Sequence, residues 1–377
     1  MKRTLSLAVM ICFIFVIITV LIERFSPAFK NKIIRSRVNN IQTSASSYNP
    51  IPPTLNTIFS KDHSWIATLS AAHIRTLLVT GDIIPARSVN NAVVSRNNYI
   101  WPYERVIEPI KKLHPDITFV NLESPLIHNC GTTVEGMIFC GSDKNIDGLK
   151  AINVTVASLA NNHAGNHDIN GVNETIAHLL ENNIAVTGIN GAFIKNIRGV
   201  RFAFLGYNDI SSPQPGIENA DENLIIEEIA EAKRKADVVI VMYHWGVEYR
   251  SQPDERQKYL AHFTIDHGAD LVLSNHPHWI QPVEVYKNKY IMYAHGNFIF
   301  DQMWSEETKK GVIGLYTFYD NQLIDAQYFP LYIESYGQAH FVDDPMRQAI
   351  LNNLRDQSLS LQEETAQTTS LRVEAAK

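Results

Sequence analysis

Two histidines, His163 and His167, stand four residues apart in the segment SLANNHAGNHD. On a helix this spacing would place both imidazoles on one face, as zinc proteases require. Those proteases carry a glutamate directly after the first histidine, but here Ala164 follows, and Gly165 would weaken a helix by roughly 1 kcal/mol. The preceding residues 154–159 form an apolar run of strand length. The sequence therefore favours a loop after a strand, whose chemistry differs from that of a zinc helix.

Residues able to bind a metal or transfer a proton follow five of the six apolar runs that look like strands in this part of the chain. They are Asp82 after 76–80, Glu123 after 117–120, Asn161 to His163 after 154–159, His244 after 238–243, and His276 and His278 after 271–273. Capping of helices and turns would explain one such residue, but not all of them. Because ligands of open α/β sheets bind beyond the carboxyl ends of the strands, the pattern predicts one shared metal site.

The residue types suit a transition-metal hydrolase. Imidazole binds Mn, Zn and Fe, whereas carboxylates suit harder ions and can bridge two of them. His276 and His278 are two apart in an extended segment and project to the same side. An asparagine oxygen is a neutral ligand that leaves net positive charge on the metal. Asn162 is therefore a candidate ligand, the neighbouring His163 a candidate general acid, and His167 a bystander.

The elements around these residues alternate between strand and helix, which predicts an α/β fold. Strands are expected at 76–80, 117–122, 154–159, 202–205, 238–242 and 271–273, and helices at 104–113, 172–183, 222–236 and 254–267. From Val283 onward strand follows strand, which indicates antiparallel β structure. Beyond Asp343 a helical segment is expected to lead into a disordered polar tail. The folded domain is thus predicted to cover 74–342, followed by a tail at 343–377.

Residues 1–24 are predicted to form a membrane anchor. Within them, residues 5–22 carry no charge and are just long enough to span the hydrocarbon core. The alternative is a cleaved signal peptide, but no small-residue cleavage site follows. Residues 25–73 are polar and are expected to form a linker. More basic residues follow the span than precede it, which favours a cytoplasmic domain, although long domains are translocated largely regardless of charge.

Cys130 and Cys140, the two cysteines outside the apolar span, indicate on which side of the membrane the domain lies. They are separated by a short segment with two glycines that permit a tight return. Two buried free thiols are the alternative, but the spacing favours a disulfide. Such a bond persists only in an oxidising compartment, which favours a domain outside the cytoplasm.

Composition excludes one class of partner. The formal net charge is −6 with both signs mixed along the chain, so no electrostatic surface for nucleic acid is expected. The basic residues do not gather with aromatic ones into a stacking surface.

The motifs in this order resemble those of the CapA family of poly-γ-glutamate capsule synthesis proteins. The matching segments are Gly81–Asp82 with Arg87, Asn121–Leu126, Ser158–His163, His244–Tyr249, His276–His278 with Gln281, and Tyr293–Phe298 with Phe300–Gln302. The resemblance runs from about Leu77 to Gln302. It extends to the calcineurin-like metallophosphoesterase superfamily, and it implies a four-layer fold of two stacked sheets flanked by helices. It also implies an extracytoplasmic domain on a membrane anchor.

The resemblance assigns roles position by position. Asp82 matches the first-strand aspartate, Glu123 the bridging carboxylate, Asn162 the asparagine ligand, His163 its catalytic neighbour, and His244, His276 and His278 the later histidine ligands. The superfamily has a histidine two residues after the aspartate, where this chain has Ile84. One tightly held divalent transition metal (Mn, Zn or Fe) is therefore expected, with a weak or empty second position. Asn166 stands where the CapA pattern usually has an aspartate, and Asp168 is a candidate substitute.

Three further residues are candidates for supporting roles. Arg87 and Asn161 are candidate substrate contacts, and the guanidinium of Arg87 could hold a carboxylate or phosphate in a fork. A structural ion pair is the alternative for Arg87. Glu248 is a candidate partner that orients His244, and an ordinary surface acid is the alternative.

Three functions stay open on these observations. The first is a metal-dependent hydrolase or transferase that acts on poly-γ-glutamate, or a related anionic polymer, or on its attachment. The second is a non-catalytic subunit with a relict metal site that holds the polymer or other membrane proteins of capsule synthesis. The third is a phosphoesterase with another envelope substrate. Fold alone cannot choose among them, because function resides in the site.

Overall fold

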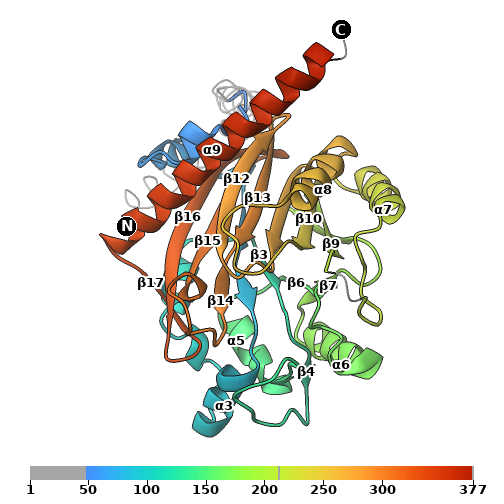
Figure 1. Ribbon diagram of the computed structural model, residues 1–377, viewed down its shortest axis with the longest axis vertical. Coiled ribbons are helices and arrows are strands. Elements are labelled where there is room, and N and C mark those ends of the chain that lie inside the picture. The colour runs from blue at the N-terminus through green and yellow to red at the C-terminus, as the bar shows by residue number, and fades with distance from the viewer. Residues whose placement is uncertain (1–47, 211–212, 376–377) are drawn as a thin grey trace, which may run out of the picture. The chain divides into compact units, whose positions relative to one another are not determined.

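The computed structural model describes residues 48–210 and 213–375, and two β-sheets form their centre (Figure 1). The seven-stranded sheet has the order β17-β16-β15-β1-β3-β6-β7. Its strands are β1 (Ile74–Val79), β3 (Ile117–Asn121), β6 (Val156–Ser158), β7 (Ala185–Thr187), β15 (Lys310–Tyr319), β16 (Gln322–Glu334) and β17 (Gln338–Phe341). Strands β1, β3, β6 and β7 run parallel, and the C-terminal strands join them antiparallel through β15.

The six-stranded sheet has the order β12-β13-β11-β10-β9-β8. Its strands are β8 (Phe193–Ile197), β9 (Val200–Asn208), β10 (Val238–His244), β11 (Leu271–Asn275), β12 (Ile280–Tyr286) and β13 (Lys289–His295). The four central strands are parallel, whereas β8 and β12 pair antiparallel at the two edges. Short pairs, β2 (Asp82–Ile83) with β14 (Asn297–Ile299) and β4 (Leu126–Ile127) with β5 (Gly141–Ser142), lie outside the two sheets.

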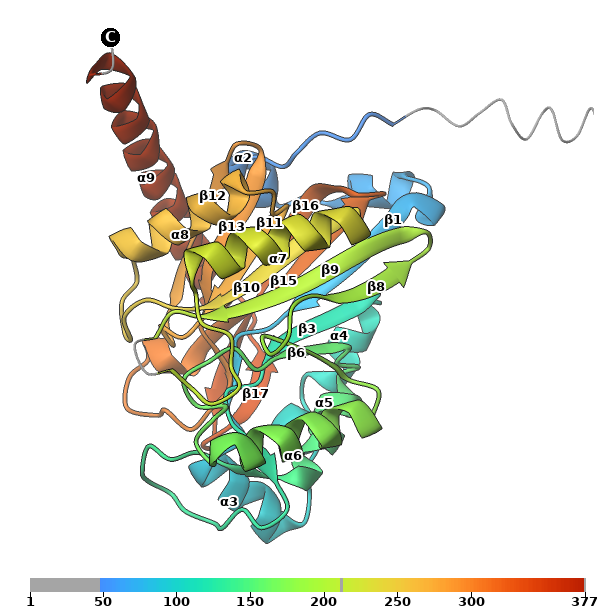
Figure 2. The same ribbon diagram turned by 90° about the vertical axis from the view of Figure 1, so that its right-hand side faces the viewer.

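Helices cover the outer face of each sheet, which makes four layers (Figure 2). Against the seven-stranded sheet pack α3 (Arg87–Arg96), α4 (Ile107–Lys112), α5 (Ile146–Ala151) and α6 (Asp168–Glu181). Against the six-stranded sheet pack α7 (Glu222–Lys235) and α8 (Glu255–Asp266). The implied layered α/β architecture is therefore present in the described part of the chain.

Strand β10 shows why its sequence is apolar throughout. Val238, Ile240 and Met242 face the core between the two sheets. Val239 and Val241 face the core beneath α7 and α8. A parallel strand buried on both faces needs apolar residues at every position, so its sequence does not alternate. The first residue free to be polar is His244, at the strand end.

The antiparallel structure expected from Val283 onward is present, because β12 pairs antiparallel with β13, and β16 pairs antiparallel with both β15 and β17. The first pair joins the six-stranded sheet, whereas β15 to β17 join the other sheet. Part of the expected linker is folded: α2 (Leu55–Ile58) buries Leu55 and Ile58 in the core between the sheets. Short 3₁₀ turns occur at Ser64–Thr68, Ala71–His73, Trp101–Tyr103, Asp143–Asn145 and Glu307–Lys309.

The expected anchor, residues 1–24, lies outside the described residues. Within the described ranges, no helix combines the length and the apolarity needed to cross a bilayer.

The C-terminal segment is one long helix, α9 (Met346–Ala375), where a helix followed by a disordered tail was expected. It covers the free edge of β12. Val283 N–H donates to Ser358 Oγ at 3.0 Å and Val285 N–H donates to Gln362 Oε1 at 2.9 Å, while Gln362 Nε2 donates to the Val285 carbonyl at 3.2 Å. The side chains of Ser358 and Gln362 therefore form hydrogen bonds with backbone groups at the edge of β12. Without these bonds, the exposed N–H and C=O groups could pair with a strand of another chain.

We expect Gln362→Ala to lower the free energy of unfolding by about 1 kcal/mol, because two hydrogen bonds to the β12 edge are lost together. Urea denaturation followed by circular dichroism measures the change. Glu363→Ala, one residue away on an exposed face of α9, is the matched control and should leave the midpoint unchanged. Equal midpoints for the two variants would contradict a structural role for the edge contacts.

Candidate metal centre

The loops at the carboxyl ends of strands from both sheets meet in the interior and carry the candidate ligands. The structure brings together six predicted side chains: Asp82, Glu123, Asn162, His244, His276 and His278. All except Asn162 are buried. The loop at Gly81 lies so close to the loop at Gly296 that position 81 must be glycine. A Cβ at this position would lie 2.2 Å from the Gly296 carbonyl oxygen. The Asp82 N–H donates to this same oxygen at 3.0 Å.

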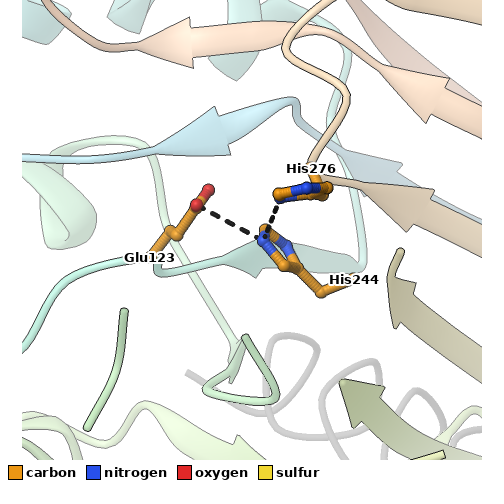
Figure 3. A group of neighbouring side chains, drawn as sticks. All are labelled: Glu123, His244 and His276. Carbon is orange, nitrogen blue, oxygen red and sulfur yellow. Dashed lines mark hydrogen bonds and ion pairs between the residues drawn. The ribbon is translucent and has the colours of Figure 1, made fainter. Parts of the chain in front are cut away.

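Three donor atoms lie around His244 Nε2 and form a group of four with it (Figure 3 shows three of the residues). Asn162 Oδ1 lies 2.8 Å from it, His276 Nδ1 3.1 Å and Glu123 Oε1 3.3 Å. Donor atoms that share one Zn²⁺-like ion at ~2.1 Å are separated by about 3–3.4 Å. The spacing of this set, two histidine nitrogens with a carboxylate and an amide oxygen, therefore fits a single metal ion.

Glu123 supplies an independent test of whether a metal fits. Its side chain is fully buried, and neither carboxylate oxygen has a hydrogen-bond partner. Burial, and then the charge of Asp82, raise the pKa of Glu123 well above its ordinary range. Burial also lowers the pKa of His244 to about 3, so the 3.3 Å contact between its Nε2 and Glu123 Oε1 involves a neutral imidazole and is no ion pair. A bound cation would satisfy the buried carboxylate that the protein itself leaves without a partner.

A second group consists of Asp82, Glu123 and His278, whose donor atoms lie within 4.8 Å of one another. His278 Nδ1 lies 3.1 Å from Asp82 Oδ2. Burial disfavours the charged forms of Asp82 and His278, but the hydrogen bond and the charge interaction between these two groups outweigh that effect. The pKa of Asp82 is lowered, and that of His278 is raised to about 9.

The position of Ile84 explains why this second group is smaller. Ile84 is fully buried in an apolar cluster with Ala86, Phe139 and Phe300. The site therefore has an apolar wall where the superfamily pattern has a histidine.

His163 lies in a loop, which excludes the zinc helix. Phe139 N–H donates to Asn166 Oδ1 at 2.7 Å, and this fixes the amide oxygen on the side where His163 Nδ1 lies 2.9 Å away. His163 Nδ1 must therefore carry a proton, which leaves Nε2 for proton transfer. Asn166 thus orients His163, whereas Asp168, expected as a substitute, is exposed at the start of α6. Burial lowers the pKa of His163 to about 4.

Asn161, expected from the sequence as a substrate contact, makes structural hydrogen bonds, and its role toward substrate stays a prediction. It is fully buried, and its Oδ1 accepts hydrogen bonds from the backbone N–H groups of His163 and Ala164. Its Nδ2 donates to Asn121 Oδ1 at 3.1 Å, and Asn121 Nδ2 donates to Asp82 Oδ1 at 2.8 Å. A chain of hydrogen-bonded amide side chains therefore orients the carboxylate of Asp82. Asn121 was overlooked as a positioning residue, although its place at the end of β3 was a signal.

A pocket of about 370 Å³ opens beside the ligands, and His163, His278 and Arg87 line it. One wall is the loop closed by the disulfide between Cys130 and Cys140, the pairing that the sequence favoured. Arg87 forms an ion pair with Asp301, and its guanidinium lies 4.9 Å from the ring centres of both Phe139 and Phe300. Arg87 therefore forms the structural ion pair that was its alternative assignment, and its role as a substrate contact stays a prediction.

Four residues of the site have left-handed backbone conformations. The φ angles are 100° at His276, 56° at His278, 62° at Tyr249 and 49° at Arg87. Each such residue costs of order 1–3 kcal/mol and persists only where the surrounding structure enforces it.

Two stacked mixed sheets with helices, and a buried cluster of carboxylates and histidines at their strand ends, define a layered α/β protein with groups that could hold a metal. The family model of the bacterial capsule synthesis protein PGA_cap matches residues 76–302, and the chain belongs to this family. The resemblance drawn from the motifs is thereby confirmed.

Relatives of this chain include two capsule proteins of Bacillus. The chain is 32% identical over 251 residues to the PGA biosynthesis protein CapA of Bacillus subtilis, a match that covers 62% of this chain and 65% of the relative. It is 31% identical over 282 residues to the capsule biosynthesis protein CapA of Bacillus anthracis, covering 69% and 67%. A solved phosphatase from Mycoplasma pneumoniae superposes with a TM-score of 0.46 at 12% identity, over 73% of this chain and 96% of that one. A similarity this low transfers no activity.

We expect Glu123→Gln to have opposite effects on the metal-free and the metal-loaded protein. Folding raises the pKa of Glu123 above its unfolded value of about 4.5. The folded state therefore holds this proton more tightly than the unfolded state, and the free energy of unfolding falls as pH rises above that value. In chelator, the variant should therefore gain stability over the wild type as pH rises from about 5 to about 8, by at most ~1.4 kcal/mol per pH unit. With metal, it should be the less stable of the two.

Urea denaturation at several pH values, with and without Mn²⁺, measures both effects. Glu135→Gln is the control, because this acid lines the same pocket but is exposed. A variant that lost stability in chelator at every pH would show that Glu123 is satisfied within the apoprotein.

Proposed function

We propose that this protein is a membrane-anchored, metal-dependent hydrolase or transferase that acts on poly-γ-glutamate, or on the attachment of that polymer, during capsule assembly. Family membership and the names of the Bacillus relatives support the polymer and the process. The observation that carries the catalytic part is the convergence of Glu123, Asn162 and His276 on His244 Nε2, beside a pocket.

A divalent transition metal held by these residues would supply positive charge that polarises the bond under attack. The chain itself supplies the proton transfer. His163 faces the pocket, and its Nε2 is the only ring nitrogen free to exchange a proton, since Nδ1 donates to Asn166. Burial keeps His163 neutral until an anionic substrate beside it favours the protonated form, which then protonates the leaving group.

The charges of the pocket bear on how an anionic polymer would be held. Its lining includes three acids, Glu135, Glu248 and Asp301. The one arginine of the lining, Arg87, is paired with Asp301. Binding of a polycarboxylate therefore depends on the metal for most of its favourable electrostatics.

Neighbouring substitutions separate chemistry from metal binding. We expect His163→Ala to keep the metal but to lose turnover of a substrate with a poor leaving group by on the order of 10²–10⁴-fold, because a positioned acid is missing. Activated substrates, whose leaving groups need no proton, should lose much less. Asn162→Ala should instead lower metal occupancy. His167→Ala, a histidine of the same loop without a role in the site, is the matched control.

Metal analysis of each variant and turnover of poly-γ-glutamate and of a generic phosphodiester provide the measurements. Loss of metal from His163→Ala would show that the assignment of the pair is reversed. Capsule formation unaffected by either change would favour a non-catalytic subunit that holds other membrane proteins of capsule synthesis. Turnover of the phosphodiester alone would favour a phosphoesterase with another envelope substrate.

The proposed location is outside the cytoplasm, with residues 1–24 as the anchor. The apolar run at 5–22 and the disulfide, which persists only under oxidising conditions, support it. Protease added to cells opened only at the outer envelope should digest residues 25–377, while a cytoplasmic marker stays intact. Full protection of the domain would place it on the cytoplasmic side.

A further inference from the structure

We propose that Glu248 is a metal ligand, and that it completes the second metal position where Ile84 has displaced the superfamily histidine. The inference rests on the metal centre of the proposed function. It replaces the sequence expectation that Glu248 orients His244, since the contact of its carboxylate is with His278: Glu248 Oε1 lies 3.9 Å from His278 Nε2.

The first step is the protonation of His278. Asn297 Nδ2 donates to the Thr308 carbonyl at 2.9 Å, which fixes Asn297 Oδ1 on the side of His278, 2.9 Å from its Nδ1. An amide oxygen only accepts, so Nδ1 carries a proton. The nitrogen of His278 left for a metal is Nε2, and this is the atom that faces Glu248.

The second step is the placement of Glu248. Its carboxylate and the donor atoms of His276 and His278 lie within 4.8 Å of one another. The turn that carries it is tied to the histidine loop, because Tyr249 N–H donates to the Pro277 carbonyl at 2.8 Å. Tyr249 has a φ of 62° and its hydroxyl accepts a hydrogen bond from Gln302 at 2.9 Å. The carboxylate is thus held in the pocket by a strained, braced turn, unlike an ordinary surface acid.

The third step is chemical. The first position has two histidine nitrogens and two oxygens from Glu123, Asn162, His244 and His276. Asp82 and Glu123 form one group with His278, and Glu248 forms another with His276 and His278, so His278 is common to both groups. A second position that draws on both groups would have three carboxylates and one histidine nitrogen. Carboxylate oxygens suit harder ions such as Mn²⁺. Three carboxylates also bring enough negative charge to offset a second cation beside the first. We therefore infer a second, carboxylate-rich position selective for a hard divalent cation.

The test counts Mn²⁺ bound to the purified full-length chain after chelation and equilibrium dialysis at a fixed free concentration. Wild type should bind two ions per chain and show the electron paramagnetic resonance signal of a coupled pair. Glu248→Gln, close in shape, should bind one, with the coupled signal lost and the affinity of the second ion lowered at least ~100-fold. Glu135→Gln, which removes an exposed acid of the same pocket, should behave as wild type. Equal melting temperatures in chelator verify that Glu248→Gln is folded.

The outcomes separate the two proposals. Two ions bound with unchanged affinity in Glu248→Gln would overturn the role of Glu248 and leave the metal centre standing. One ion in wild type and variant alike would do the same, and would restore the weak second position expected from Ile84. No ion bound to the wild type would overturn the metal centre itself, and with it the proposed catalytic function.

Discussion

Burial of the Glu123 carboxylate beside Asp82 is the constraint on which the architecture of the centre depends. Two acids in an apolar interior repel each other, and Glu123 accepts no hydrogen bond. Such a group is costly unless a proton or a cation compensates it. Histidines from the second sheet provide the remaining donors, but burial keeps His244 and His276 neutral. They can therefore hold a cation without competing with it, which is the arrangement a metal requires.

This constraint explains why the site needs both sheets. Asp82, Glu123 and Asn162 follow strands β1, β3 and β6 of the seven-stranded sheet. His244 ends β10, and His276 and His278 follow β11, both in the six-stranded sheet. Amide side chains fix three groups of the site, Asp82, His278 and His163. Asn121 and Asn161 aim Asp82, Asn297 sets the protonation of His278, and Asn166 sets that of His163. Each amide is itself fixed by a backbone group or by a neighbouring amide. The polar network is thus specified without adding charge to a region that is already rich in acids.

Much of the centre was predictable because strand ends are marked in the sequence. An apolar run followed by Asp, Glu, Asn or His identifies a carboxyl end, and the six candidate ligands were found in this way. The roles that the local sequence did not indicate depend on distant neighbours. Asn161 was expected to contact substrate, and the structure gives it a positioning role in the amide chain. Asp168 was expected to orient His163, but Asn166 does so because Phe139, brought in by the disulfide loop, fixes its amide.

The sequence by itself determined the alternation of strands and helices, the ligand types and their order along the chain, because these follow from local periodicity and composition. The tertiary structure alone decided which sheet each C-terminal strand joins, since an apolar strand pairs equally well with many partners until the cores are formed. It also decided that α9 covers the β12 edge, and that Glu248 lies beside His278. Such contacts join segments far apart in the chain, and no local pattern encodes the distance between them.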